Sequence, residues 1–201
     1  MAFGDPYITR DELKSWLKIP LADTLDDMEL DAALAGATSS IDMATERTFN
    51  RDTTASPSAT ARTFRPMMRG LALVDDFYST AGLIIRTEGG ATTWAADDYL
   101  LEPRNGVYRG SPGWPYWKVR SLARDLDVGS YDLEVTALWG WAEVPAGIKQ
   151  ATRLLAADLF KLKDAPLGVA GFGELGLVRV RENSTVASLI RPYRKNPVKV
   201  R

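Results

Sequence analysis

The sequence offers few residues that could carry out covalent or metal chemistry. It has no histidine and no cysteine, which removes the most common general base, thiolate nucleophiles and the usual zinc ligands. Adjacent acids are the remaining candidates, in the pairs Asp26-Asp27, Asp75-Asp76 and Asp97-Asp98. Neighbouring residues of a strand point to opposite faces, so such a pair chelates one ion poorly. We therefore expect no enzymatic activity, no metal site and no cofactor.

One glycine-rich segment has the spacing G-x-G-x-x-G that dinucleotide-binding loops show, from Gly171 to Gly176. In those proteins the loop follows a strand and opens a helix. Here a helical pattern precedes the segment, and a strand pattern at Leu177–Arg181 follows it. The order is reversed, so the segment is predicted to be a loop or a hairpin turn rather than a cofactor site.

Tryptophan is concentrated in the middle of the chain, at Trp94, Trp114, Trp117, Trp139 and Trp141. Exposed tryptophans could form a stacking platform for bases or sugars. The alternative is that they fill a small core or a subunit interface. A nucleic-acid platform needs basic residues among the aromatic ones, and this region is close to neutral. We expect the core or interface role.

Charge is distributed unevenly between the two ends of the chain. Residues 1–50 contain four Lys or Arg and ten Asp or Glu, a net of −6, whereas residues 188–201 contain five Lys or Arg and no acid. These ends could pair within one molecule or between neighbours. The basic end also contains two prolines and alternating Val198 and Val200. That pattern suits an extended arm that adds to another protein's sheet; a solvated tail and a phosphate-binding segment are the alternatives.

Two helices are predicted before residue 50. Thr9 to Glu12 form a capping box, and Leu13, Trp16 and Leu17 give the following helix one apolar face, before Pro20 ends it. A second helix is expected from near Thr24 to about Arg47. Its apolar stripe has helical spacing and consists of Leu30, Leu34, Ala37, Ile41 and Ala44.

The sequence from Arg62 to Trp141 predicts β structure. Short apolar runs separated by turn residues predict seven strands, around Arg62–Arg65, Leu71–Val74, Leu83–Thr87, Thr92–Trp94, Tyr99–Glu102, Tyr116–Leu122 and Tyr131–Trp139. Gly89-Gly90 suits a tight hairpin turn between two of them. Seven short strands indicate a small sandwich or barrel.

Helical periodicity returns at Val144, with Pro145 at the first helical position. The apolar stripe of this helix is Ile148, Ala151, Leu155, Leu159 and Leu162. A further short helix is expected to begin near Asn183 or Ser184 and to end at Pro192. Its inward residues would be Val186, Leu189 and Ile190.

These elements predict an α+β fold in which the helices at the two ends of the sequence bury their apolar faces against each other. Residues 1–50 would form the first part of a helical bundle, and residues 51–143 a small inserted antiparallel β domain. Residues 144–187 would form the second part of the bundle, with the glycine-rich loop and the short helix. Residues 188–201 would form an extended basic C-terminal arm. No apolar run approaches the ~20 residues of a membrane span.

Several segments resemble, in wording and order, the head–tail connector (adaptor) proteins of long-tailed bacteriophages. The matching segments are YITRDELKSWLKIP, DDYLLEPRNGVY, VTALWGWAEVPAGIKQATRLLAADLFKLKDAPLGVAGFGELGLVRV and LIRPYRK. The most specific part is the aromatic-Gly-aromatic strand end, Trp139-Gly140-Trp141, followed by Val-Pro and a helix rich in Ala and Leu. The resemblance covers nearly the whole chain and contains no catalytic signature.

The resemblance implies a structural role in the neck of a virion that is assembled in the host cytoplasm, with no membrane involved. Such adaptors form a ring, usually of twelve copies, beneath the portal protein. The ring extends the channel for the encapsidated double-stranded DNA, which passes without sequence-specific binding, and it docks the next neck or tail protein. C-terminal arms grip the portal. By that similarity the portal contacts would be Arg191, Tyr193, Arg194, Lys195, Val198, Lys199, Val200 and Arg201.

The acidic second helix provides another expected site. DNA must slide through the channel, and a strongly basic lining would hold it. The acids at the start of the helix could line the channel and repel DNA: Asp26, Asp27, Glu29 and Asp31. Their stabilisation by the helix dipole is the alternative explanation.

Two other functions remain open at this point. One is a stopper or tail-completion protein of the same neck. The other is a nucleic-acid- or glycan-binding β module with helical flanks, which exposed tryptophans and salt-sensitive binding would favour.

Overall fold

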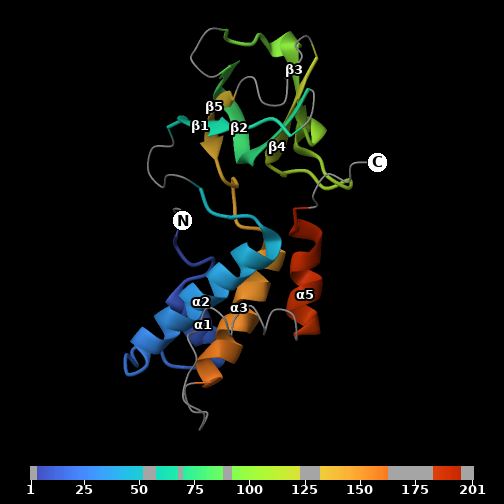
Figure 1. Cartoon of the computed structure of the whole chain (residues 1–201). Helices are drawn as coiled ribbons and strands as arrows, with labels where there is room; N and C mark the ends of the chain where they lie inside the picture. The colour runs from blue at the N-terminus through green and yellow to red at the C-terminus, as the bar shows by residue number, and fades with distance from the viewer. Residues whose placement is uncertain are drawn as a thin grey trace. The chain divides into compact units, whose positions relative to one another are not determined.

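The computed structural model describes residues 4–51, 58–67, 70–87, 92–122, 132–162 and 183–195. They form two compact units, one from the described parts of Phe3–Phe49 and Val144–Arg201 and the other from those of Asn50–Glu143. The first unit is helical and the second is built on an antiparallel sheet (Figure 1). The expected α+β fold is confirmed. None of the described helices combines the length and apolar character needed to cross a membrane.

The helical unit combines segments from both ends of the sequence. Its elements are α1 (Arg10–Leu17), α2 (Asp27–Thr45), α3 (Ala146–Lys161), α5 (Ser184–Ile190) and the 3-10 turn η4 (Arg191–Tyr193). The helices α2 and α3 lie side by side, and α5 packs on α3 (Figure 1). The mutual burial that the sequence predicted for the two ends is therefore the basis of this unit.

The predicted apolar stripes form the core of the helical unit. Both long helices and α5 bury the residues that helical spacing selected, namely Leu30, Leu34, Ala37, Ile41, Ile148, Ala151, Leu155, Leu159, Val186 and Ile190. Burying one large aliphatic side chain contributes about 1.5–3 kcal/mol. Ala44 and Leu162, at the ends of the stripes, and Leu189 of α5, which was also predicted to face inward, are only half-buried.

Local signals set the ends of these helices. The predicted capping box is present, because the Thr9 hydroxyl accepts the Glu12 amide at 3.2 Å and the Glu12 carboxylate accepts the Thr9 amide at 2.7 Å. The second helix begins at Asp27 rather than near Thr24, since a turn precedes it in which the Asp27 amide donates to the Thr24 carbonyl. Pro145 is the residue before the first turn of α3 and not its first helical residue.

The second unit is a single antiparallel sheet. Its strands are β1 (Thr60–Phe64), β2 (Leu71–Thr87), β3 (Tyr99–Glu102), β4 (Tyr116–Ser121) and β5 (Leu133–Trp139), with the 3-10 turns η1 (Ala96–Asp98) and η2 (Arg104–Gly106) on either side of β3. The order across the sheet is β1-β5-β2-β4-β3. Alternate residues of β5 are buried, namely Leu133, Val135, Ala137 and Trp139.

The prediction of a sandwich or barrel of seven strands is wrong. The predicted strands Leu71–Val74 and Leu83–Thr87 are the two ends of the single strand β2, and the predicted strand Thr92–Trp94 contributes only an isolated bridge at Thr93. The segment between the two ends contains small and polar residues and resembles a turn in sequence. In the sheet it is accommodated as a register shift between Ser79 and Ile84, where Gly82 has a φ of 69°.

Three sequence-based predictions fall outside the described residues. They are the hairpin turn at Gly89-Gly90, the glycine-rich segment Gly171 to Gly176 and the strand Leu177–Arg181.

The Trp-Gly-Trp segment at the end of β5 ties three parts of the β unit together. The indole Nε1 of Trp139 donates to the Thr60 carbonyl at 2.9 Å. The amide of Gly140 donates to the Asp76 carbonyl at 2.6 Å. The indole Nε1 of Trp141 donates to the Asp76 carboxylate at 2.9 Å. The motif that carries most of the family resemblance is therefore a structural junction.

Gly140→Ala is expected to destabilise the β unit much more than Gly110→Ala. A Cβ at Gly140 would lie 1.9 Å from the carbonyl oxygen of Asn50, whereas nothing lies within 4 Å of a Cβ at Gly110. The φ angles are 94° and 81°, so each substitution costs about 1–2 kcal/mol for the left-handed backbone. The difference between the two therefore measures the clash. Urea unfolding followed by tryptophan fluorescence gives both values, and equal losses would contradict the prediction.

Candidate docking surfaces

The predicted C-terminal arm begins as helix rather than as extended chain. Ser188 lies within α5, which continues to Ile190 because Val186 and Ile190 are both buried on α5's inner face. The next three residues form η4. Within the predicted portal-contacting set, Arg191 and Arg194 are exposed. The other members beyond Lys195, which are Val198, Lys199, Val200 and Arg201, lie outside the described residues.

Tyr193 and Lys195 fasten this end of the chain to the helical unit. The Tyr193 ring meets the Phe49 ring edge to face, with centroids 5.7 Å apart, and Phe49 meets Tyr7 in the same way at 5.6 Å. The Lys195 amide donates to the carbonyl of Thr45, the last residue of α2, at 2.9 Å. Each such aromatic pair contributes about 0.5–1.5 kcal/mol beyond its burial. The chain is therefore held to the body of the unit as far as Lys195.

A half-buried acid supports this aromatic anchor. The Tyr7 hydroxyl donates to the Asp42 carboxylate and accepts the Phe49 amide at 3.0 Å. Burial raises the pKa of Asp42 to about 6, and hydrogen bonds from Tyr7 and Thr48 oppose that rise. Burial, together with the nearby charge of Asp42, also raises the pKa of Tyr7. The anchor thus contains one carboxylate that changes its charge in mildly acidic solution.

Asp42→Asn is expected to remove part of the pH dependence of stability between pH 4 and pH 6. The folded pKa, about 6, lies above the ordinary value of 3.8, so the folded state binds this proton more tightly than the unfolded chain does. The stabilisation is present at low pH and is lost as the pH rises through about 6. As the pH rises from 4 to 6, the urea midpoint of the wild type should fall relative to that of the variant. Above this interval the difference between the two midpoints should stay constant. A constant difference from pH 4 to pH 8 would exclude this role for Asp42.

Two bases of α1 pair with two acids of α2. Arg10 Nη1 lies 2.8 Å from Asp31 Oδ2 and 3.5 Å from Asp27 Oδ2, and Lys14 Nζ lies 2.5 Å from Asp27 Oδ1. The bases are four residues apart on their helix and the acids four apart on theirs, so each pair shares one helix face. This matched spacing is visible in the sequence, but spacing alone does not show that the two pairs meet. Two of the four acids predicted to line a channel therefore have basic partners in their own chain, and Glu29 is exposed.

Lys14→Met is expected to destabilise the helical unit by about 3 kcal/mol, as removal of one partner of a buried pair does. The Lys14 side chain is 2% exposed, and its ammonium also donates to the Asp23 carbonyl at 2.6 Å. Methionine keeps the length of the side chain and removes the charge. Chemical unfolding gives the loss, with Lys161→Met at an exposed site of α3 as the control. Similar losses for the two variants would contradict a structural role for the buried pair.

Exposed apolar side chains occur on α1, on the loop that leads to α2 and in the first turn of α2. Trp16, Leu21, Leu25 and Met28 are 48%, 60%, 86% and 83% exposed. Trp16 was predicted to face inward with Leu13, but only Leu13 is buried. We call these four apolar residues, together with the exposed acids Asp11 and Glu29, the head surface.

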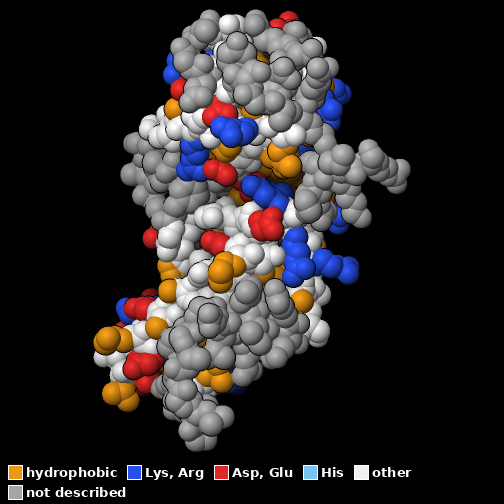
Figure 2. Space-filling model, viewed as in Figure 1, with side chains coloured by type: hydrophobic (Ala, Val, Ile, Leu, Met, Phe, Trp, Pro, Cys, Tyr) orange, Lys and Arg blue, Asp and Glu red, His pale blue; other side chains and the backbone are white. Residues whose placement is uncertain are grey.

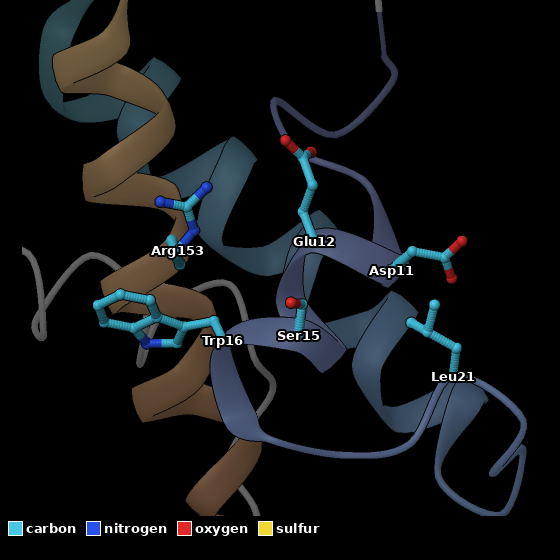
Figure 3. A pocket seen from close by; sticks show the side chains of 6 residues that line it. All are labelled: Asp11, Glu12, Ser15, Trp16, Leu21 and Arg153. Carbon is cyan, nitrogen blue, oxygen red and sulfur yellow. The ribbon is translucent and has the colours of Figure 1, made fainter.

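A pocket of about 480 Å³ lies within the head surface and is lined by Asp11, Glu12, Ser15, Trp16, Leu21 and Arg153 (Figure 3). The guanidinium of Arg153, from α3, lies 5.6 Å from the centre of the Trp16 ring. In Figure 3 the Glu12 side chain projects from α1 between Trp16 on one side and Asp11 on the other. The pocket is an acidic and apolar hollow on the outside of the unit, and sequence analysis did not identify it.

The tryptophans of the β unit form core rather than a stacking platform. Trp94, Trp117, Trp139 and Trp141 are at most 9% exposed. Trp114 is half-buried, and its ring centre lies 5.1 Å from that of Trp141. The predicted core role is confirmed, since these rings are not available for bases or sugars.

The predicted acid pairs also have structural partners. Asp75 pairs with Arg62 at 2.8 Å, and the Asp98 carboxylate accepts the Ala95 amide at 2.9 Å. Across the described ranges, no group of three or more acidic, histidine or cysteine side chains is placed to hold a metal ion.

Comparison with known proteins gives matches only among solved structures. No family model matches the sequence, and no curated protein matches it. A chain of the "Neck of empty GTA particle computed with C6 symmetry" has a TM-score of 0.55 and 18% identity, and the match covers 96% of this chain and 91% of that chain.

Two further chains match with lower scores. A chain of the virion of a native gene transfer agent (GTA) particle has a TM-score of 0.47 and 20% identity, with 98% and 94% of the two chains covered. A chain of the neck of a native GTA particle computed with C12 symmetry has a TM-score of 0.46 and 17% identity, with 98% and 97% covered. At these identities a match shows the fold alone. The expectation of a neck-protein fold is thus confirmed by the first of the three structures.

Proposed function

We propose that this chain is a structural protein of a phage or phage-like virion neck. It forms a ring beneath the portal, extends the channel for double-stranded DNA and docks the next neck or tail protein. The observation that carries the proposal is the similarity to a chain of a GTA neck, because it covers 96% of this chain and 91% of that one. The similarity therefore involves this particular combination of helical unit and inserted sheet, and not one common motif.

The portal contact is assigned to the basic C-terminal segment of the chain. Arg191 and Arg194 are exposed on η4 and just after it. Because Tyr193 and Lys195 are fastened to the helical unit, the part of the arm that can reach a partner starts at residue 196. The arm would then contact the portal through Val198, Lys199, Val200 and Arg201, with Arg191 and Arg194 at its base.

Truncation after Lys195 is expected to weaken binding to the portal ring of the same genome by about tenfold or more, equivalent to ~1.4 kcal/mol. This cut keeps buried Ile190 and the Tyr193 anchor, whereas a cut after Ser188 would remove both. Co-sedimentation with purified portal rings measures binding, and urea unfolding checks that the truncated chain is as stable as the full chain. The full-length double variant Lys199→Glu with Arg201→Glu provides a matched control that keeps the length of the arm.

Short duplex DNA is the second ligand in this experiment. If neither form binds the portal and the full chain binds DNA with a steep salt dependence, the protein is a nucleic-acid-binding module instead. The buried tryptophans weigh against that alternative. A chain that binds only a portal already carrying another ring would be a stopper or tail-completion protein.

A channel-lining role for Asp26, Asp27, Glu29 and Asp31 is the alternative to a subunit contact at this end of the helical unit. Lys14 and Arg10 already compensate the charges of Asp27 and Asp31. Repulsion of DNA would therefore depend chiefly on Glu29, which is exposed, and it requires that Glu29 face the channel rather than a neighbouring copy.

A further inference from the structure

The head surface has the composition of a protein contact. Leu25 and Met28 are more than four-fifths exposed, and Trp16 and Leu21 are 48% and 60% exposed. Large exposed apolar side chains that gather on one part of a soluble protein mark interaction sites. Asp11 lines the same pocket as Trp16 and Leu21, and Glu29 follows Met28 in the first turn of α2; both acids are exposed and have no ion pair with a described residue. A partner that fits this surface presents apolar groups together with positive charge.

The same helical unit presents such a surface at its other end. The described segment from Asn183 to Lys195 contains three bases and no acid. Arg191, Pro192 and Arg194 are exposed there; we call these three residues and Lys195 the basic end. Figure 2 shows acidic and apolar side chains together where α1 and α2 meet, and Lys or Arg side chains beside the C-terminal end of α5.

A chain cannot cover its own head surface with its basic end. Lys195 is hydrogen-bonded to Thr45 at the C-terminal end of α2, whereas Met28 lies in the first turn of that helix. The 19 residues of α2 span about 28 Å. The two oppositely charged surfaces can therefore meet only between different copies.

We propose that the head surface of one copy binds the basic end of the next copy around the ring. This inference rests on the proposed ring function and identifies its subunit contact. Two different patches on one body give a head-to-tail contact, which closes into a ring when the rotation between neighbours allows it. Burial of Leu25 and Met28 supplies affinity, while Asp11 and Glu29 opposite Arg191 and Arg194 fix the orientation.

Cysteine cross-linking tests this contact directly, because the natural chain contains no cysteine. The double variant Met28→Cys with Arg194→Cys is treated with a flexible bismaleimide, both bound to portal rings and free at high concentration. A head-to-tail contact is expected to give a ladder of dimers, trimers and larger species on a denaturing gel. Each single variant should stay monomeric. The matched control pairs Met28→Cys with Ser39→Cys, an exposed position in the middle of α2, and should give no ladder.

Charge reversal provides the second measurement. Asp11→Lys with Glu29→Lys should reduce the ladder of the double-cysteine chain by about tenfold, equivalent to ~1.4 kcal/mol. Arg191→Glu combined with these two reversals should restore it, because the charges are again complementary.

Two results would overturn the inference. The inference is wrong if cross-linking gives no ladder either on the portal or in the concentrated free chain. It is also wrong if the Met28→Cys single variant forms dimers, because such dimers indicate a symmetric contact. If the chain binds portal rings in many copies and still gives no ladder, the adaptor function stands and the head surface serves a different neck protein. If the ladder forms but the portal is not bound, the contact stands and the adaptor function fails.

Discussion

The packing of α2 against α3 is the contact on which the rest of the structure depends. The two helices come from opposite ends of the sequence, with the whole β unit between them, so the helical unit is complete only after the chain has returned from the insertion. Each helix buries a single stripe and leaves its other faces to α1 and α5. This non-local contact places Phe49, at the exit from α2, where Tyr193 can pack on it. The C-terminal end of the chain is therefore positioned by a core that the N-terminal end helps to build.

The anchor at Tyr193 divides the basic segment into two parts with different roles. Up to Lys195 the chain belongs to the body of the helical unit, so Arg191 and Arg194 are presented from a defined place. Only the residues after Lys195 belong to the proposed arm. In the proposed ring, this division would let one short segment supply a subunit contact at its base and a portal contact at its end. Protruding arms add interface area without enlarging the body.

Charged residues are distributed unevenly over the helical unit. Most acids of the helical unit precede residue 50 and a run of bases follows residue 188, and the acids in the first turn of α2 lie a helix length from Thr45, where Lys195 is held. Some of the acids form ion pairs within the unit, where Lys14 and Arg10 hold α1 to α2. In the proposed contact, the exposed apolar residues of the head surface would supply affinity, and Asp11 and Glu29 would supply orientation. Such a polar arrangement favours head-to-tail assembly over symmetric dimers, because like charges would meet in a symmetric contact.

The sequence by itself determined the elements whose signals are local. The capping box at Thr9, the buried stripes of α2 and α3, strand β3 and the division into a helical and a β unit all follow from spacing and turn chemistry. Only the tertiary structure decided that β2 is one strand with a register shift, because neighbouring strands satisfy a backbone that looks like a turn in isolation. It also decided that Trp16 stays exposed while Lys14 is buried, since that depends on which acids α2 brings to the face of α1. The sequence also shows the charge of the proposed arm, but the tertiary structure decides where the arm begins. Its first residue is set by contacts with Phe49 and Thr45, which lie far from it along the chain.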